Sequence, residues 1–469
     1  MVMRSISLKT SNKPYWPFFL FLFIILSITV FVLLSKHEKQ GVVMLEKVRA
    51  WGDVSISKYK FSNGLTVILA EQQKVPLFAY QTWFHVGSRR EKNGKTGIAH
   101  FFEHLLFKET KNLKEGEFDR IMEENGASTN AGTWVDWTYY YETLPADPQK
   151  IELVIKLESD RMRNMILNER QIESERGVIM NERRFRVDND VDGSMSEALD
   201  RLAYDVHPYG LPTIGWMEDI QHLSLEDCIQ FYKTYYSPNN ATIVVVGNID
   251  AKQTLKWIEQ YYGVYPAATI PPEEVNVEPP QKGLKKKTLH REDIDSEKVI
   301  YAYHATEYGH KDTPTIELLG EILFNGEGSR LYRMMVTNEE IAADVHSTLA
   351  HLEHPSLFQI SVAMRKGEPL QKSHNRVLKE IKRIQDEGVT EKELERAKNR
   401  VEMDYWSGLG TVSGKARALG NYEVIAGDYK EAIHLIKQYQ SITTLDIQRV
   451  AKQYLNEDNL TRVEAKPKK

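Results

Sequence analysis

The fold and the chemistry of this 469-residue chain are decided by one stretch, Thr96-Gly97-Ile98-Ala99-His100-Phe101-Phe102-Glu103-His104-Leu105-Leu106-Phe107. It contains no proline, and apolar residues recur at helical spacing on both sides of the histidines, which predicts a buried helix. In such a helix His100 and His104 lie one turn apart on one face and can hold the same metal ion. Glu103 lies on the same side and can act as a base on a water molecule there without being a ligand. The stretch therefore predicts a hydrolytic metal site.

A catalytic zinc ion takes three protein ligands and leaves one position open. The chain has one cysteine, Cys228, so the third ligand should be His, Asp or Glu. Residues 172–184 are predicted to form a helix in which Glu175 and Glu182, seven positions apart, share a face. Acidic residues on a helix more often form a solvated face. The residues alone leave both readings open.

Several further stretches extend the motif to almost the whole chain, roughly residues 54–460. These stretches, and the order in which they follow one another, resemble the pitrilysin/insulinase family of zinc metallopeptidases, the inverzincins. The resemblance is strongest to the short members related to the mitochondrial processing peptidase and its bacterial relatives. The matching stretches are Val86-Gly87-Ser88, residues 100–104, Asn130-Ala131-Gly132-Thr133, Tyr139-Tyr140-Tyr141-Glu142, residues 158–162, Glu175-Arg176 leading to Glu182, His207-Pro208-Tyr209, Gly215-Trp216 and residues 236–240.

The resemblance implies one Zn²⁺ per chain and a role for each matching residue. The implied zinc ligands are His100, His104 and Glu182. Glu103 would be the base that activates water, and Glu175 the acidic residue that orients the site. The strand after the motif would bind the backbone of a peptide substrate through Asn130, Ala131 and Thr133.

The pattern of elements predicts an α+β fold of two homologous halves, each an antiparallel sheet packed with helices. The first half should contain a hairpin at residues 54–69, a strand at 77–86 and helices at 151–164 and 169–187. The second should contain strands at 298–304 and 357–364 and helices at 313–324, 369–387 and 391–408. The resemblance adds that the halves face each other like a clamshell, with zinc on the first.

The predicted boundaries follow from composition and from the resemblance. They are a cytoplasmic N-terminus (1–13), a transmembrane anchor or signal segment (14–35), a spacer (36–53), an N-terminal peptidase domain with the zinc site (54–265), a proline-rich linker (266–283) and a zinc-free C-terminal homologous domain (284–469). The basic stretch at 282–287 is predicted to be a solvated end of the linker. His207 is predicted to be a packed structural residue.

Residues 14–35 carry no charge and are long enough to span a bilayer as a helix. Arg4, Lys9 and Lys13 precede them. A cleaved signal peptide is the alternative, but the apolar run is long for one and no Ala-x-Ala-like site follows. We expect an uncleaved anchor with the catalytic part extracytoplasmic, in the periplasm if the source is bacterial.

The overall charge is small, with 61 Lys plus Arg against 66 Asp plus Glu, and predicts no nucleic-acid partner. A single cysteine excludes an intramolecular disulfide bond.

In one respect the chain departs from the family. Complete enzymes carry an Arg and a Tyr, seven residues apart in the second half, that stabilise the oxyanion. Val336 and Ala343 occupy the matching positions, and neither side chain can donate a hydrogen bond. We therefore expect a homologous partner without zinc that supplies the pair. An alignment slip, or compensation by Tyr301, Tyr303 or Tyr308, is the alternative.

The expected function is that of a membrane-anchored zinc endopeptidase for short or unfolded peptides, as the catalytic subunit of a heterodimer. A non-catalytic structural subunit, or a peptide-binding protein that retains the metal, is the alternative.

Overall fold

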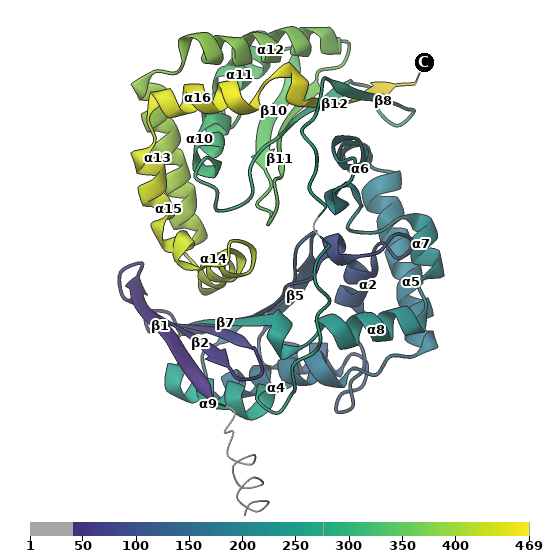
Figure 1. Cartoon of the computed structure of the whole chain (residues 1–469), viewed down its shortest axis with the longest axis vertical. Coiled ribbons are helices and arrows are strands. Elements are labelled where there is room, and N and C mark those ends of the chain that lie inside the picture. The colour runs from purple at the N-terminus through teal and green to yellow at the C-terminus, as the bar shows by residue number, and fades with distance from the viewer. Residues whose placement is uncertain (1–40, 275, 469) are drawn as a thin grey trace, which may run out of the picture.

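The computed structural model describes residues 41–274 and 276–468, which form two halves that each contain one sheet. Figure 1 shows the halves one above the other, with the motif helix α2 (Ile98–Leu105) in the first. The predicted membrane segment, residues 14–35, lies outside the described residues. Within the described ranges, no helix is both long and apolar enough to cross a membrane.

The first sheet has seven strands in the order β1-β2-β3-β7-β4-β6-β5. Its strands are β1 (Val42–Ala50), β2 (Val54–Phe61), β3 (Thr66–Glu71), β4 (Leu77–Phe84), β5 (Ser128–Thr133), β6 (Thr138–Pro145) and β7 (Ala241–Gly247). Its helices are α2, α3 (Glu117–Glu124), α4 (Pro148–Asn164), α5 (Glu169–Arg183), α6 (Val191–Ala203), α7 (Met217–His222), α8 (Leu225–Tyr235) and α9 (Ala251–Tyr262), with short 3-10 helices η1 (Ser88–Arg90), η3 (Pro208–Gly210) and η4 (Pro238–Asn240) and a short π-helix η2 (Arg184–Asp188). The predicted hairpin is confirmed, because β2 and β3 pair antiparallel.

The second sheet has five strands in the order β10-β11-β9-β12-β8. They are β8 (Lys285–Arg291), β9 (Lys298–His304), β10 (Ala342–Leu349), β11 (Leu357–Met364) and β12 (Leu460–Pro467). The helices are α10 (Thr313–Leu323), α11 (Arg330–Tyr332), α12 (Leu370–Glu387), α13 (Glu391–Gly408), α14 (Val412–Ile425), α15 (Lys430–Ser441) and α16 (Thr444–Tyr454), with a short π-helix η5 (Arg333–Asn338) and a short 3-10 helix η6 (Glu457–Asn459). The two-half α+β architecture therefore agrees with the prediction.

Two details of the prediction were wrong. Neither sheet is purely antiparallel, because β3 pairs parallel with β7 and β8 parallel with β12. Each late strand returns only after a long helical segment, which permits a parallel crossover. The expected spacer at 36–53 contains β1, which pairs with β2. The basic stretch at 282–287 is solvated as predicted, with Lys282, Lys286 and Lys287 exposed. Its last three residues begin the edge strand β8, where Lys286 Nζ lies 3.0 Å from the fully buried carboxylate of Glu464.

One helix of each half packs on the sheet of the other half. Helix α14 of the second half packs on the first sheet, with Ala416 and Leu419 in one apolar cluster with Ile68. Helix α6 of the first half packs on the second sheet, where Leu199 shares a cluster with Val463. Burial of these faces interlocks the two halves, because neither sheet is covered on both sides without the other half.

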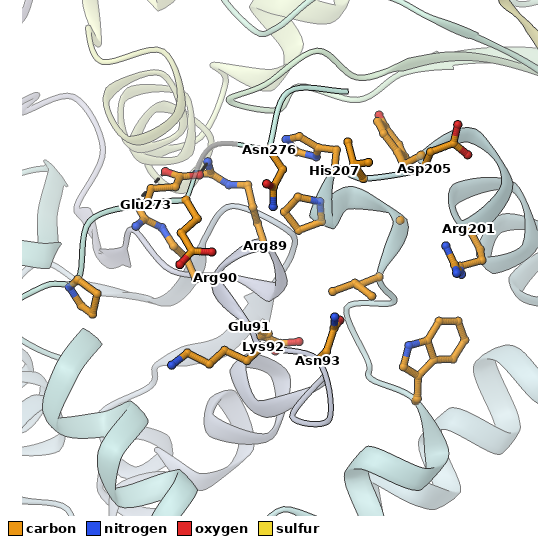
Figure 2. Close-up of a pocket in the computed structure, with 18 of the residues that line it drawn as sticks. Arg89, Arg90, Glu91, Lys92, Asn93, Arg201, Asp205, His207, Glu273 and Asn276 are labelled. Atoms are coloured by element: carbon orange, nitrogen blue, oxygen red, sulfur yellow. Dashed lines mark hydrogen bonds and ion pairs between the residues drawn. The ribbon is translucent and has the colours of Figure 1, made fainter. Parts of the chain in front are cut away.

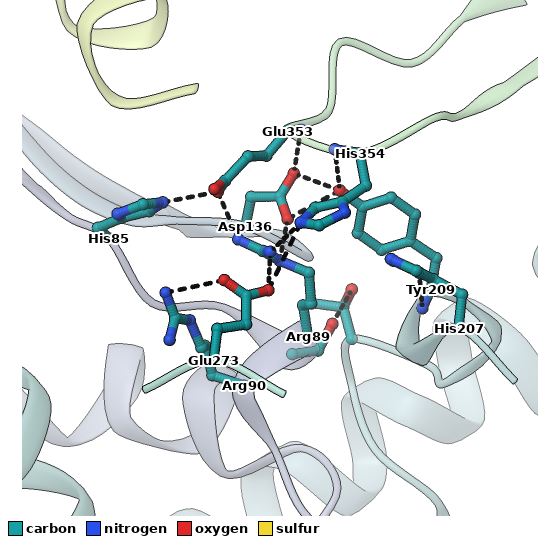
Figure 3. A network of polar contacts seen from close by, with 11 residues as sticks. His85, Arg89, Arg90, Asp136, His207, Tyr209, Glu273, Glu353 and His354 are labelled. Carbon is teal, nitrogen blue, oxygen red and sulfur yellow. Dashed lines mark hydrogen bonds and ion pairs between the residues drawn. The ribbon is translucent and has the colours of Figure 1, made fainter. Parts of the chain in front are cut away.

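A polar network joins the halves beside these helices (Figure 3). At its centre is Arg89 of η1, whose side chain is only 1% exposed and whose Nε lies 2.7 Å from Asp136 Oδ1. The same guanidinium pairs with Glu273 in the predicted linker and with Glu353 in the second half. One buried cation therefore connects the first half, the linker and the second half.

Candidate metal centre

The motif helix α2 begins at Gly97, whose φ of 87° lies in the left-handed region that glycine tolerates. Its first free N–H groups are capped from outside the helix by Glu91. The Glu91 carboxylate accepts from the backbone N–H of Gly97 at 2.7 Å and from that of Ala99 at 2.8 Å. The cap satisfies donors that would otherwise be buried without a partner, and so fixes where the helix starts.

The helix that carries Glu182 is tied to this same point. Arg183 Nη1 donates to the carbonyl oxygen of Gly215 at 2.7 Å and pairs with Glu197 at 2.8 Å. Gly215 in turn lies against Gly97, where an added Cβ would come within 2.6 Å of the Ile214 carbonyl oxygen. The residue after the predicted ligand therefore holds α5 against the start of α2.

The structure brings the three predicted ligands together. Glu182 Oε2 lies 3.5 Å from His100 Nε2 and 3.4 Å from His104 Nε2. The three donor atoms all lie within 4.8 Å of one another. A tetrahedral zinc ion about 2.1 Å from each donor needs donors about 3.4 Å apart. Two imidazoles and one carboxylate at this spacing fit zinc.

Surrounding side chains orient the ligands. His104 Nδ1 lies 3.3 Å from Glu175 Oε2, and Lys108 Nζ lies 2.6 Å from the other oxygen of Glu175. With Nδ1 donating to Glu175, the lone pair of His104 is on Nε2, which faces Glu182. Arg186 Nε contacts Glu182 Oε1 at 2.8 Å, so that Oε2 is left for the metal.

The pKa values of the two histidines move in opposite directions. Burial, with the charge of His104, lowers the pKa of His100 to about 4, so this imidazole is neutral at pH 7. Burial also disfavours the charged form of His104, but hydrogen bonds to Glu175 and Glu182 outweigh it and raise its pKa to about 9. Because a metal binds only the neutral imidazole, a metal ion held here would displace the proton of His104.

Glu103 lies beside these ligands without being one of them. Burial raises the pKa of its carboxyl, although the hydroxyl of Thr133, which hydrogen-bonds to it, acts in the opposite direction. A cavity of about 400 Å³ opens next to it, with His104, Lys108 and Asn130 in its wall. A buried carboxylate with a raised pKa at the edge of a cavity is suited to general acid–base chemistry.

The predicted substrate-binding residues lie on β5, an edge strand of the first sheet. The register places Asn130 opposite Tyr141 and Ala131 opposite Tyr140. Directly opposed residues point to the same face. Ala131 and Thr133 therefore face the same side as Tyr140, toward α2. The side chain of Asn130 points to the other face, and Asn130 borders the cavity beside Glu103 at the edge of the strand. An edge strand offers unpaired backbone groups to an extended peptide.

The tyrosines considered as replacements for the missing pair lie elsewhere. Tyr301 and Tyr303 are buried in the core of the second half, and Tyr308 stacks on His351 with ring centroids 4.2 Å apart. None of the three lines the cavity beside Glu103.

A second group with the composition of a metal site, Glu273, Glu353 and His354, also lies within the described ranges. The guanidinium of Arg89 lies among these side chains, with Nη1 2.6 Å from His354 Nε2 (Figure 3). Arg89 also pairs with both carboxylates. The arginine therefore takes the place of a metal cation there.

A cavity of about 890 Å³ lies away from the predicted site. Figure 2 shows it between the loop before α2, the segment after α6 and the predicted linker, with charged residues of both signs in its wall. The labelled lining includes Arg90, Lys92, Arg201, Asp205 and Glu273. It contains none of the predicted ligands.

Three residues that position the site were not predicted from the sequence: Glu91, Lys108 and Arg183. Lys108 follows His104 by four positions, a spacing that could have indicated a contact along the same face. Glu91 and Arg183 act on glycine backbones brought together by the fold, and no local pattern marks them.

Comparison with known proteins agrees with this geometry. The family model "Insulinase (Peptidase family M16)" matches residues 66–216, and "Peptidase M16 inactive domain" matches residues 222–401. The chain is 31% identical to the zinc protease PqqE of Helicobacter pylori over 86% of this chain and 91% of that one. It is 24% identical to the mitochondrial-processing peptidase subunit beta of Lentinula edodes over 84% and 86%.

Solved structures show the same fold. A protease from Helicobacter pylori, at 29% identity, superposes with a TM-score of 0.85 over 88% of this chain and 99% of that one. The periplasmic protease PqqL from Escherichia coli, at 19% identity, has a TM-score of 0.74 over 90% of this chain but only 48% of its own. The predicted resemblance is confirmed: this chain belongs to the insulinase family of peptidases, peptidase family M16.

Proposed function

We propose that this chain is a zinc-dependent endopeptidase that cleaves short or unfolded peptides. The observation that carries the proposal is the convergence of His100, His104 and Glu182 at zinc spacing, with Glu103 beside a cavity. Zinc, when bound, polarises the scissile carbonyl and makes the attacking water more acidic. Glu103 accepts the proton of that water and returns it to the departing nitrogen, which its raised pKa favours.

The substrate binds in extended form along β5. The outer edge of this strand is unpaired by any described strand, and α2 with Glu103 lies next to it. Main-chain hydrogen bonds to β5 provide affinity with little dependence on sequence. This mode excludes stably folded substrates, because their strands are already paired.

A homologous subunit without zinc completes the active site. Two observations support this proposal. Val336 and Ala343 cannot donate hydrogen bonds to an oxyanion. The chain also spans about half the length of PqqL, whose fold therefore holds a second part of similar size within one chain. The partner supplies the Arg and Tyr that the second half lacks.

The missing pair also favours a second candidate, a subunit that retains zinc and binds peptides without cleaving them. In either case residues 14–35 anchor the chain in a membrane, with the site extracytoplasmic, and periplasmic in a bacterium. The support is the uncharged apolar run in the sequence.

Cleavage of a quenched fluorescent peptide library tests the proposal. The zinc-loaded chain is assayed alone and with a homologous protein encoded beside it. Glu103→Gln is the matched control, because it keeps the size of the side chain and removes the base. Cleavage that Glu103→Gln abolishes, while the variant still binds zinc, supports the peptidase. Full activity of Glu103→Gln would contradict the role of Glu103 as the base. Full activity of the isolated chain would contradict the need for a partner subunit. Peptide binding without any cleavage, with or without the partner, would favour the second candidate.

A further inference from the structure

A row of aromatic side chains lines the face of the first sheet opposite α2. Tyr139 of β6 lies directly opposite Gly132 of the edge strand β5, so the two share one face. The neighbouring residue Tyr140 points the other way, since its hydroxyl contacts the Phe102 carbonyl oxygen of α2 at 3.5 Å. Tyr139 is therefore on the side of β5 away from the zinc ligands.

The ring of Tyr139 is fixed by its neighbours. It stacks on Trp83 with centroids 4.3 Å apart and on Tyr141 at 5.0 Å, and Trp137 meets it edge-on at 5.1 Å. The ring lies over Gly132, where an added Cβ would be 3.1 Å from Tyr139 Cε1. The aromatic packing holds the ring in one orientation, directed across β5 toward the open edge.

The hydroxyl of Tyr139 remains available although the residue is only 7% exposed. Among the described residues it has no hydrogen-bond partner, and it is not sealed from solvent. Burial raises its pKa, so the hydroxyl stays protonated and can donate. A rigid donor without a protein partner at a sheet edge is available to a ligand.

Helix α14 brings a second donor to the same place. Gln81 Nε2 of β4 donates to the Ser413 carbonyl oxygen at 3.3 Å, and a Cβ on Gly420 would be 2.2 Å from Trp83 Nε1. Arg417 lies between Ser413 and Gly420 at helical spacing, hence on the same face of α14. It is exposed and, among the described residues, forms no ion pair; its charge acts on Tyr139.

We propose that Tyr139 and Arg417 form a specificity subsite for an acidic side chain of the substrate. This inference rests on the proposed function and names the class of peptide that the site prefers. A strand added to β5 presents alternate side chains to the two faces of the sheet. The Tyr139 ring occupies the space over Gly132, so a substrate side chain that shares this face beside Gly132 lies next to that ring. This side chain meets two donors, one of them positively charged, so an Asp or Glu carboxylate matches them.

The test uses the zinc-loaded full-length chain in detergent, with its partner if activity requires one. A matched set of quenched fluorescent peptides moves a single Glu, Gln or Lys through the positions that flank the scissile bond. At one position, Glu should be preferred to Gln by about tenfold in kcat/KM, the scale of one charge-assisted hydrogen bond. Arg417→Gln should remove this preference, and Arg417→Glu should reverse it in favour of Lys.

Two further variants separate the subsite from general effects. Tyr139→Phe keeps the aromatic stack and should reduce the Glu preference only partly. Arg383→Gln, an exposed arginine on α12, should leave the preference unchanged. A Glu preference that survives Arg417→Gln, or equal rates for Glu and Gln throughout, would overturn the subsite while leaving the peptidase intact.

If no peptide is cleaved, the proposed peptidase activity is contradicted, and a binding measurement then tests the subsite by itself. Fluorescence anisotropy of the labelled peptides is then measured on the zinc-loaded Glu103→Gln chain. Tighter binding of a Glu peptide that Arg417→Gln abolishes would support the subsite. Equal Kd values for the Glu and Gln peptides would overturn it.

Discussion

Replacement of Arg89 with Met should lower the free energy of unfolding by about 3–5 kcal/mol, the cost of breaking a buried ion pair from one side. The side chains of Arg89 and Asp136 are 1% and 0% exposed. Asp136 keeps its hydrogen bonds from the Tyr209 hydroxyl and the Glu353 N–H but loses the only cation in contact with it among the described residues. Glu273 and Glu353 are partly exposed and can be rehydrated. Most of the loss therefore comes from the isolated charge of Asp136.

Urea unfolding followed by circular dichroism measures this loss. The double variant Arg89→Met/Asp136→Asn should recover most of it, because Asn still accepts from Tyr209 but carries no charge. Lys74→Met is the matched control, since Lys74 pairs with Asp53 on the surface, where both are more than two-thirds exposed. It should cost no more than about 1 kcal/mol. Equal losses for Arg89→Met and Lys74→Met would refute the reasoning.

Three other predictions follow from the site and the interface. Glu175→Gln and Lys108→Met should each weaken zinc binding by about 10–100-fold in chelator competition, because the His104 imidazole is then no longer held in its orientation. An unchanged zinc affinity would contradict the orienting role of Glu175 and Lys108. Burial, with the charges of His354 and Arg89, lowers the pKa of His207 from 6.5 to about 4. As the pH drops, the unfolded chain therefore binds this proton before the folded chain does, and the Tm should fall between pH 6.5 and pH 4. His207→Gln should reduce the dependence of Tm on pH in this range. An unchanged dependence in the variant would contradict the assignment to His207. Gly97→Ala should destabilise the chain far more than Gly94→Ala in urea unfolding, since both have a φ above 80° but only Gly97 is crowded. Equal losses of stability for the two variants would mean that backbone strain, and not crowding around Gly97, sets the cost of the substitution.

Local sequence patterns predicted the elements that carry the chemistry. The motif helix, the strands β9 and β11 and the helix α13 were found with bounds within a few residues, because each has a clear apolar period or turn signal. The spacing of Glu175 and Glu182 placed both on one face of α5, and the resemblance gave each a role. The structure then brings Glu175 to His104 and Glu182 to both imidazoles.

What the sequence did not reveal depends on residues far apart in the chain. The buried partner of Lys286 is Glu464, and no local pattern in the basic stretch indicates this contact. The parallel pairing of β3 with β7 depends on the path of the helices between them. The exchange of α6 and α14 between the halves leaves no local mark either, since an amphipathic helix does not encode which sheet it covers.

The interlocked halves bear on how the active site is completed. Helix α14 already covers the first sheet from within the chain, and it brings Arg417 to the face opposite α2. Tyr139 and Arg417 can therefore select a substrate side chain on that face, but on our assignment they do not replace the oxyanion donors that Val336 and Ala343 lack. The two functions have separate readouts. A partner that supplies the missing pair should raise the rate for every peptide, whereas Arg417→Gln should change only the ratio between the Glu and Gln peptides. The partner changes all rates equally, whereas the subsite changes only the ratio of two rates. The partner proposal and the subsite proposal can therefore be refuted independently.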